Sequence, residues 1–110
     1  NKWTGMSHVL VKEELLARAA RRFQLLGEPV RLDILNNLQS NGEMNVQELV
    51  EATAQSHANI SKHLRLLARE GLVSRRKAGL YAFYQIDDPS LAGICLLMCG
   101  QIKNEDNAIT

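Results

Sequence analysis

Apolar residues recur every three or four positions along the first half of the chain, which is the pattern of amphipathic helices. The pattern predicts a first helix that Ser7 can cap and that runs to about Leu26. It predicts a second helix over residues 29–41, with a proline at its first position and a turn signal at its end. A short third helix should cover residues 45–54, because its first residues resemble a capping box with Asn45 as the cap.

The stretch that follows predicts a helix with one buried and one basic face. Ser56 is a suitable N-cap residue, and Gly71 stands where a helix end favours positive φ. Ile60, Leu64 and Leu67 share one helical stripe, which should face the core. The outward face, which has almost no competing acid, comprises Ala58, Asn59, Ser61, Lys62, Arg65 and Arg69. Two short helices joined by a brief turn, the second bearing a basic face, are the helix-turn-helix arrangement, and the second is called the recognition helix from here on.

Residues 73–86 contain two β-prone runs around Ala78-Gly79 and predict a β-hairpin with a short loop. Arg75, Arg76 and Lys77 lie together on the approach to its tip. A run of charges is often only a solvated face. Directly after a helix-turn-helix, however, the run is also a candidate wing that reaches a phosphate or the minor groove of DNA.

A last helix should begin at Asp88-Pro89, and its hydrophobic residues lie on more than one side. Leu96 and Leu97 extend the apolar surface beyond the main stripe, so the helix is not expected to face water. We expect it to be buried in a homodimer interface together with the first helix, whose stripe includes Phe23. The alternative for the first helix is a surface helix packed on its own core. The predicted fold is mainly α with a β-hairpin wing.

Composition sets the limits of this prediction. The 110 residues suggest a single domain over residues 7–103, with residues 1–6 a cloning remnant or disordered end and residues 104–110 a frayed tail. The net charge of +1 does not itself mark a nucleic-acid-binding protein, so such a role must rest on where the charges lie. No apolar run could span a bilayer and no export signal is visible, so we expect a cytoplasmic protein whose cysteines are reduced.

Two segments of the chain, LGEPVRLDILNNL and ISKHLRLLAREGLV, resemble the ArsR family of bacterial winged-helix repressors. The resemblance extends from Phe23 to Ile102. It implies a homodimer that binds operator DNA and is released when a ligand, often a metal ion or metalloid, binds.

The resemblance also assigns candidate DNA contacts. The family's base-reading residues correspond to His57, Ala58, Ser61 and Lys62, whose side chains have suitable donors, acceptors or methyl groups for base edges. Asn59 and Arg65 are expected to contribute phosphate or sugar contacts, and the N-cap residue Ser56 is also a candidate DNA contact. We interpret His63 mainly as a structural histidine on the core side of the helix.

The chain departs from the family's metal-sensing pattern. The segment MNVQEL, residues 44–49, has no thiol, and His8, His57 and His63 leave the last helix without histidine. A zinc, nickel or cobalt sensor is therefore not expected.

Cys95 and Cys99 remain as candidate effector ligands. At a spacing of four, their Cβ atoms would lie about 5–6 Å apart, so a disulfide within one helix would be strained. Pairing between subunits in response to a redox effector, or binding of a thiophilic metalloid such as trivalent arsenic by thiols from the helices of both subunits, would be easier. The alternative is that both thiols only fill space as small hydrophobic groups.

The sequence thus predicts a sequence-specific, dimeric DNA-binding repressor. The alternative is a winged helix that serves as a protein-interaction or dimerisation module. An enzyme is not expected, because no acid–base pair, nucleophile motif, phosphate-binding glycine loop or metal-ligand cluster is recognisable. The operator, the regulated genes and the identity of any effector are not specified by the sequence.

Overall fold

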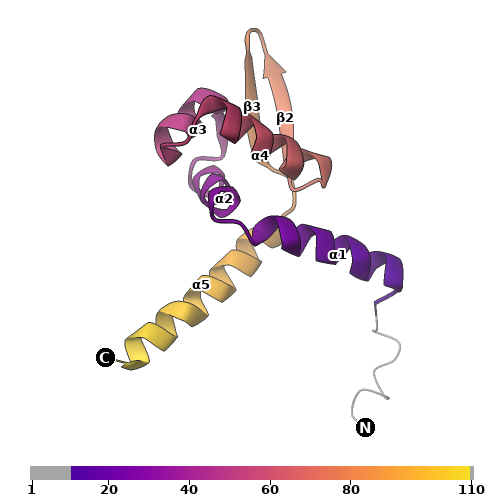
Figure 1. Cartoon of the computed structure of the whole chain (residues 1–110), viewed down its shortest axis with the longest axis vertical. Helices are drawn as coiled ribbons and strands as arrows, with labels where there is room; N and C mark the ends of the chain where they lie inside the picture. Colours follow the sequence, from indigo (N-terminus) through magenta and orange to yellow (C-terminus); the bar gives the residue numbers. More distant parts are fainter. Residues whose placement is uncertain (1–10, 110) are drawn as a thin grey trace.

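The computed structural model describes residues 11–109, which form five helices and one three-stranded sheet. The β2–β3 hairpin projects from one end of the molecule, while α1 and α5 extend away from the helical core at the other end (Figure 1). The elements in chain order are α1 (Glu13–Leu26), α2 (Pro29–Asn41), β1 (Glu43–Asn45), α3 (Val46–Thr53), α4 (His57–Arg69), β2 (Val73–Ala78), β3 (Tyr81–Ile86) and α5 (Ser90–Ile109). The winged helix-turn-helix prediction is confirmed.

The core lies where α2, α3 and α4 meet the base of the sheet. Its fully buried side chains are Ile34, Leu38, Leu49, Ile60, Leu64, Leu67 and Leu72. Burying a side chain of this kind contributes about 1.5–3 kcal/mol to stability. Because three of the seven belong to α4, the core fixes the rotation of this helix about its own axis.

The turn of the helix-turn-helix is defined by local hydrogen bonds. Asn45 Oδ1 accepts from the Glu48 amide at 2.8 Å, and the Asn45 amide donates to Glu48 Oε1 at 2.9 Å, which confirms the capping box. Ala54 ends α3 with a φ of 58°, and Ser56 Oγ then caps α4 by accepting from the Asn59 amide at 3.1 Å. Each cap satisfies an amide that the helix leaves unpaired.

The sheet contains one strand more than predicted. The strand order is β1-β3-β2, and both pairings are antiparallel. The three residues of β1 are too few to show an alternating pattern, and only Met44 among them is buried. Gly79, with a φ of 61°, provides the turn between β2 and β3.

Two predicted helix boundaries were wrong. Residues 11 and 12 are not helical and α1 begins only at Glu13, later than expected; Ser7, the expected cap, lies outside the described residues. At the other end, α5 continues through Lys103 to Ile109 instead of fraying. A hydrogen bond from Gln101 to Glu105 at 3.4 Å spans one turn of this extension.

Both terminal helices expose apolar side chains. In α1 only Leu26 is buried, whereas Phe23 is 58% exposed. In α5, Leu96 and Leu97 are 74% and 78% exposed. The alternative of a first helix packed on its own core therefore fails for most of α1. None of the helices in the described part of the chain has the length and hydrophobicity that a membrane crossing requires.

Replacement of Asn45 by alanine should destabilise the fold by about 1 kcal/mol, because it removes the cap of α3. Urea unfolding followed by circular dichroism measures the change. The matched control is Gln47→Ala on the exposed face of α3, for which we expect a change within about 0.5 kcal/mol. Equal changes in the two variants would contradict a stabilising role for the capping box.

Candidate DNA interface

The outward face of α4 presents most of the predicted DNA contacts to solvent. Ser56, His57, Ala58, Lys62 and Arg65 are exposed, while Asn59 and Ser61 are half-buried. The helix has no acidic residue along its length, and Arg69 adds a cation in its last turn. This face is therefore a cationic surface on a helix that the core holds from behind.

Two of these residues already have hydrogen-bond partners within the helix start. Ser56 Oγ accepts from the Asn59 amide, and Asn59 Nδ2 donates to Gln55 Oε1 at 2.8 Å. Their side chains are thus held in place by the helix start. Lys62 and Arg65 form no ion pair within residues 11–109, so their charges are available to a ligand.

The three cations of the hairpin differ in their surroundings. Arg76 Nε and Nη2 donate to the two carboxylate oxygens of Glu43 at 2.7 and 3.3 Å, and the guanidinium lies 5.1 Å from the centre of the Phe83 ring. These hydrogen bonds raise the pKa of Arg76 and lower the pKa of Glu43. Arg75 and Lys77 have no ion pair among the described residues. The wing therefore offers two free cations and one that is already paired.

His63 lies on the core side of α4, as we expected of a structural histidine. It is 6% exposed and faces the start of α2, where Arg31 Nη1 is 3.1 Å from its Nδ1 atom. No local pattern indicated that these two residues would meet, because they are 32 positions apart in the chain and each fits a separate helix pattern. His63 is thus separated from the exposed face of α4 that includes Lys62.

Cys95 and Cys99 line the same pocket between α2 and α5. The pocket has a volume of about 260 Å³, and Leu35, Ile86 and Leu91 contribute to its apolar wall. Both thiols are free. Burial raises the pKa of Cys95, and the nearby Cys99 raises it further. The thiol of Cys95 is therefore protonated at neutral pH, which slows its attack on oxidants.

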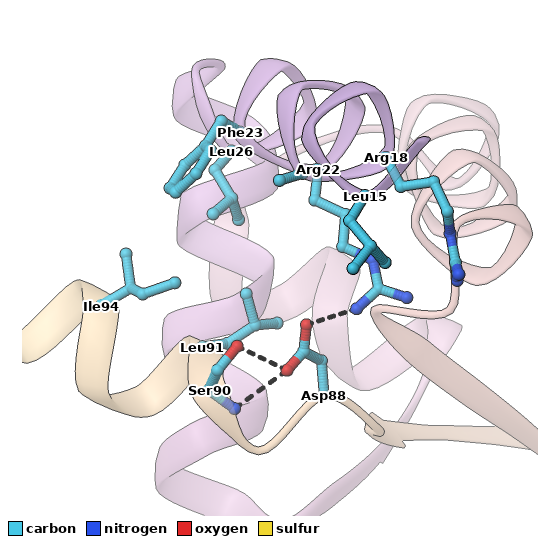
Figure 2. A pocket seen from close by; sticks show the side chains of 10 residues that line it. Leu15, Arg18, Arg22, Phe23, Leu26, Asp88, Ser90, Leu91 and Ile94 are labelled. Atoms are coloured by element: carbon cyan, nitrogen blue, oxygen red, sulfur yellow. Dashed lines mark hydrogen bonds and ion pairs between the residues drawn. The ribbon is translucent and has the colours of Figure 1, made fainter. Parts of the chain in front are cut away.

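A second pocket, of about 340 Å³, lies between α1 and the start of α5 (Figure 2). Leu15, Phe23 and Ile94 contribute apolar surface to it. At its polar end, Arg22 Nη1 donates to Asp88 Oδ2 at 2.7 Å. Hydrogen bonds from the hydroxyl and amide of Ser90, together with Arg22, lower the pKa of Asp88. The pocket is thus an apolar groove whose ion pair joins the two terminal helices.

No three histidine, cysteine, aspartate or glutamate side chains converge as metal ligands within residues 11–109. The structure thus brings together the recognition-helix residues and, separately, the two cysteines. The cysteines belong to α5, which extends from the helical core on the side away from the hairpin (Figure 1).

Known proteins similar to this chain are DNA-binding regulators. Residues 28–75 match the model of the family described as bacterial regulatory protein, arsR family. A helix-turn-helix-type transcriptional regulator of Methanocaldococcus jannaschii is 36% identical over 85 residues, which are 77% of this chain and 96% of that protein. The arsenical resistance operon repressor of Bacillus subtilis is 28% identical over 76% of this chain and 79% of the repressor.

The fold is also similar to solved structures. The homodimeric winged helix-turn-helix DNA-binding domain of a protein from Mycobacterium bovis matches with a TM-score of 0.73 and 27% identity. The match covers 91% of this chain and 93% of that domain. The likeness therefore includes the terminal helices as well as the helix-turn-helix.

Proposed function

The chain belongs to the ArsR family of bacterial regulatory proteins, and on this basis we propose that it is a homodimeric transcriptional repressor that reads operator DNA with α4. The observation that carries the proposal is the acid-free, cationic outer face of α4. Ile60, Leu64 and Leu67, each 0% exposed, fix the rotation of the helix and hold this face outward. A rigid helix of this kind fits the major groove of B-form DNA.

The side chains on this face suit two kinds of contact. His57, Ala58, Ser61 and Lys62 would contact base edges, with Lys62 donating to guanine and the Ala58 methyl packing against a thymine methyl. The phosphate and sugar contacts would come from Ser56, Asn59, Arg65, Arg75 and Lys77. Arg76 would join them through Nη1, or by exchanging the Glu43 carboxylate for a phosphate, since its Nε and Nη2 already donate to Glu43 in the free protein.

Dimerisation would occur through the apolar surfaces of α1 and α5. Leu15 and Phe23 are exposed and line the pocket between the two helices, and Leu97 and Ile102 are exposed further along α5. A second copy would remove them from water. The dimer would also carry two recognition helices, one from each subunit, which are needed to read consecutive major grooves.

The alternative of a protein-interaction module without DNA binding has less support. Such a module would not need an acid-free row of cations on α4 or the free cations Arg75 and Lys77 on the wing. Those charges occur in a chain whose net charge is only +1, so they are concentrated at the surface that would face DNA.

Lys62→Ala should reduce the preference for the operator over random DNA by about tenfold, since it removes a donor to a base edge. The operator is first selected from a random duplex library, and affinities are then measured by fluorescence anisotropy. The matched control is Arg65→Ala, which should weaken binding to all sequences and reduce the slope of log K against log salt by about one. If the Lys62 variant discriminates as well as the parent, the assignment of the reading face is wrong.

Phe23→Glu should convert the dimer to a monomer, because it places a charge in the apolar surface that the second copy covers. Analytical ultracentrifugation at micromolar concentration measures the change. Leu80→Glu is the matched control: Leu80 is 100% exposed at the hairpin tip, so the same substitution there should leave the dimer intact. A parent protein that is monomeric under these conditions would contradict the proposal.

A thiophilic effector that releases the protein from DNA is a second element of the proposed function. Cys95 and Cys99 are both free and line one pocket, so the two thiols can approach one small ligand. Arsenous acid, As(OH)₃, can form two As–S bonds with loss of two water molecules, without any change of oxidation state. Because the released species is water, the raised pKa of Cys95 does not prevent this exchange.

If this proposal holds, Cys95→Ser and Cys99→Ser should each abolish release of operator DNA by arsenite, because a single thiol cannot form the chelate. DNA release is followed by fluorescence anisotropy during an arsenite titration. Met98→Leu, an exposed apolar change on the same helix, should respond as the parent does. If both serine variants are still released normally, the cysteines are packing residues.

A further inference from the structure

Arg31 joins three parts of the structure through one guanidinium group and its own amide. Its Nε atom donates to the carbonyl oxygen of Leu25 in the last turn of α1 at 2.6 Å. Its Nη1 atom donates to Nδ1 of His63 on α4 at 3.1 Å. Its amide donates to Glu28 Oε2 at the start of α2 at 2.9 Å. Arg31 therefore connects the end of α1 to the recognition helix.

These contacts determine where the proton of His63 lies. An arginine has only donors, so the Nδ1 atom that faces Arg31 must accept and cannot carry a proton. The proton of the neutral ring is then on Nε2, which lies 4.0 Å from Glu28 Oε2. The Arg31 amide lowers the pKa of Glu28, so this carboxylate is charged at neutral pH. The neutral ring thus fits between a donor on one side and a carboxylate on the other.

Protonation of His63 would disrupt this arrangement. A second proton on Nδ1 would turn the acceptor into a donor that faces the donors of Arg31. The charged groups that act on the ring are Arg31 from α2, Lys62 from α4 itself, and Glu28 from the start of α2. Glu28 favours the charged ring, but burial and the two cations oppose it, and together they lower the pKa of His63.

We propose that Arg31, His63 and Glu28 form a polar clasp that positions the recognition helix for DNA, and that protonation of His63 opens this clasp and weakens DNA binding. The inference rests on the proposed function, because it assigns a control to the same DNA-reading face. His63 is next to Lys62 in α4, so a tilt of the helix at His63 displaces the base-reading side chain beside it. Arg31 and His63 act here as positioning residues, since neither lies on the DNA face.

The clasp also makes stability depend on pH. Since the pKa of His63 is lower in the folded protein than in the unfolded chain, the unfolded chain binds more protons between the two values. Stability is therefore complete above the ordinary histidine pKa of about 6.5 and falls as the pH drops below it. This change is measured without DNA, so it tests the clasp separately from the proposed function.

The experiment compares two proteins that both carry His57→Gln, so that they differ only at His63 and the other described histidine of α4 does not enter the comparison. One protein keeps His63, and the other carries His63→Gln, whose amide accepts from Arg31, donates toward Glu28 and does not titrate. Affinity for the selected operator is measured at about pH 7.5 and about pH 5.5. The protein with His63 should lose operator affinity in acid, but by less than the roughly tenfold expected of an unperturbed histidine, because burial lowers the pKa of His63.

The protein with His63→Gln should show no such additional loss, and its unfolding free energy should not follow the pH dependence attributed to His63. A third protein, with His63→Leu, keeps the bulk but removes the acceptor, and it should bind about fivefold or more weakly already at pH 7.5. If the leucine variant does not fold, the comparison of His63 with His63→Gln tests the clasp by itself.

An identical response of operator affinity to acid with and without His63 would overturn the clasp. Failure of the parent to select any operator would overturn the proposed function instead.

Discussion

The burial of one face of α4 is the interaction on which the rest of the structure depends. Ile60, Leu64 and Leu67 enter the core completely, so the helix cannot rotate without exposing large apolar side chains. Every property of the outer face follows from this constraint. Lys62 and Arg65 point to solvent because the residues between them point inward.

The same core is too small to cover the terminal helices. Leu26 and Leu91 attach α1 and α5 to it. Beyond these anchor points α1 carries exposed leucine and phenylalanine side chains, and α5 carries exposed leucine, methionine and isoleucine side chains. A chain of 110 residues encloses a modest core, and association with a second copy enlarges the buried apolar area. In this protein α1 and α5 would thus have two roles. They would stabilise the dimer, and they would set the relative position of the two α4 helices that read DNA.

The positions of the ion pairs, and not the net charge of the chain, determine where the surface is cationic. Glu43 neutralises Arg76 on the sheet, Asp88 pairs with Arg22 at the base of α5, and Glu28 compensates the cations around His63. These acids lie away from the outer face of α4, which keeps its cations unpaired. A nearly neutral protein can therefore present a strongly cationic surface where DNA would lie.

The sequence by itself determined that the five helices exist, the caps of α3 and α4, and the two faces of α4, because helical periodicity and capping chemistry act over a few residues. It also indicated the hairpin and the unusual hydrophobicity of α5. It did not indicate β1, whose three residues form a strand only because β3 pairs with them. Nor did it indicate the Arg76–Glu43 pair or the contact between Arg31 and His63, which lie 33 and 32 positions apart. Only tertiary structure decided these, since they depend on which elements pack together and not on any local pattern.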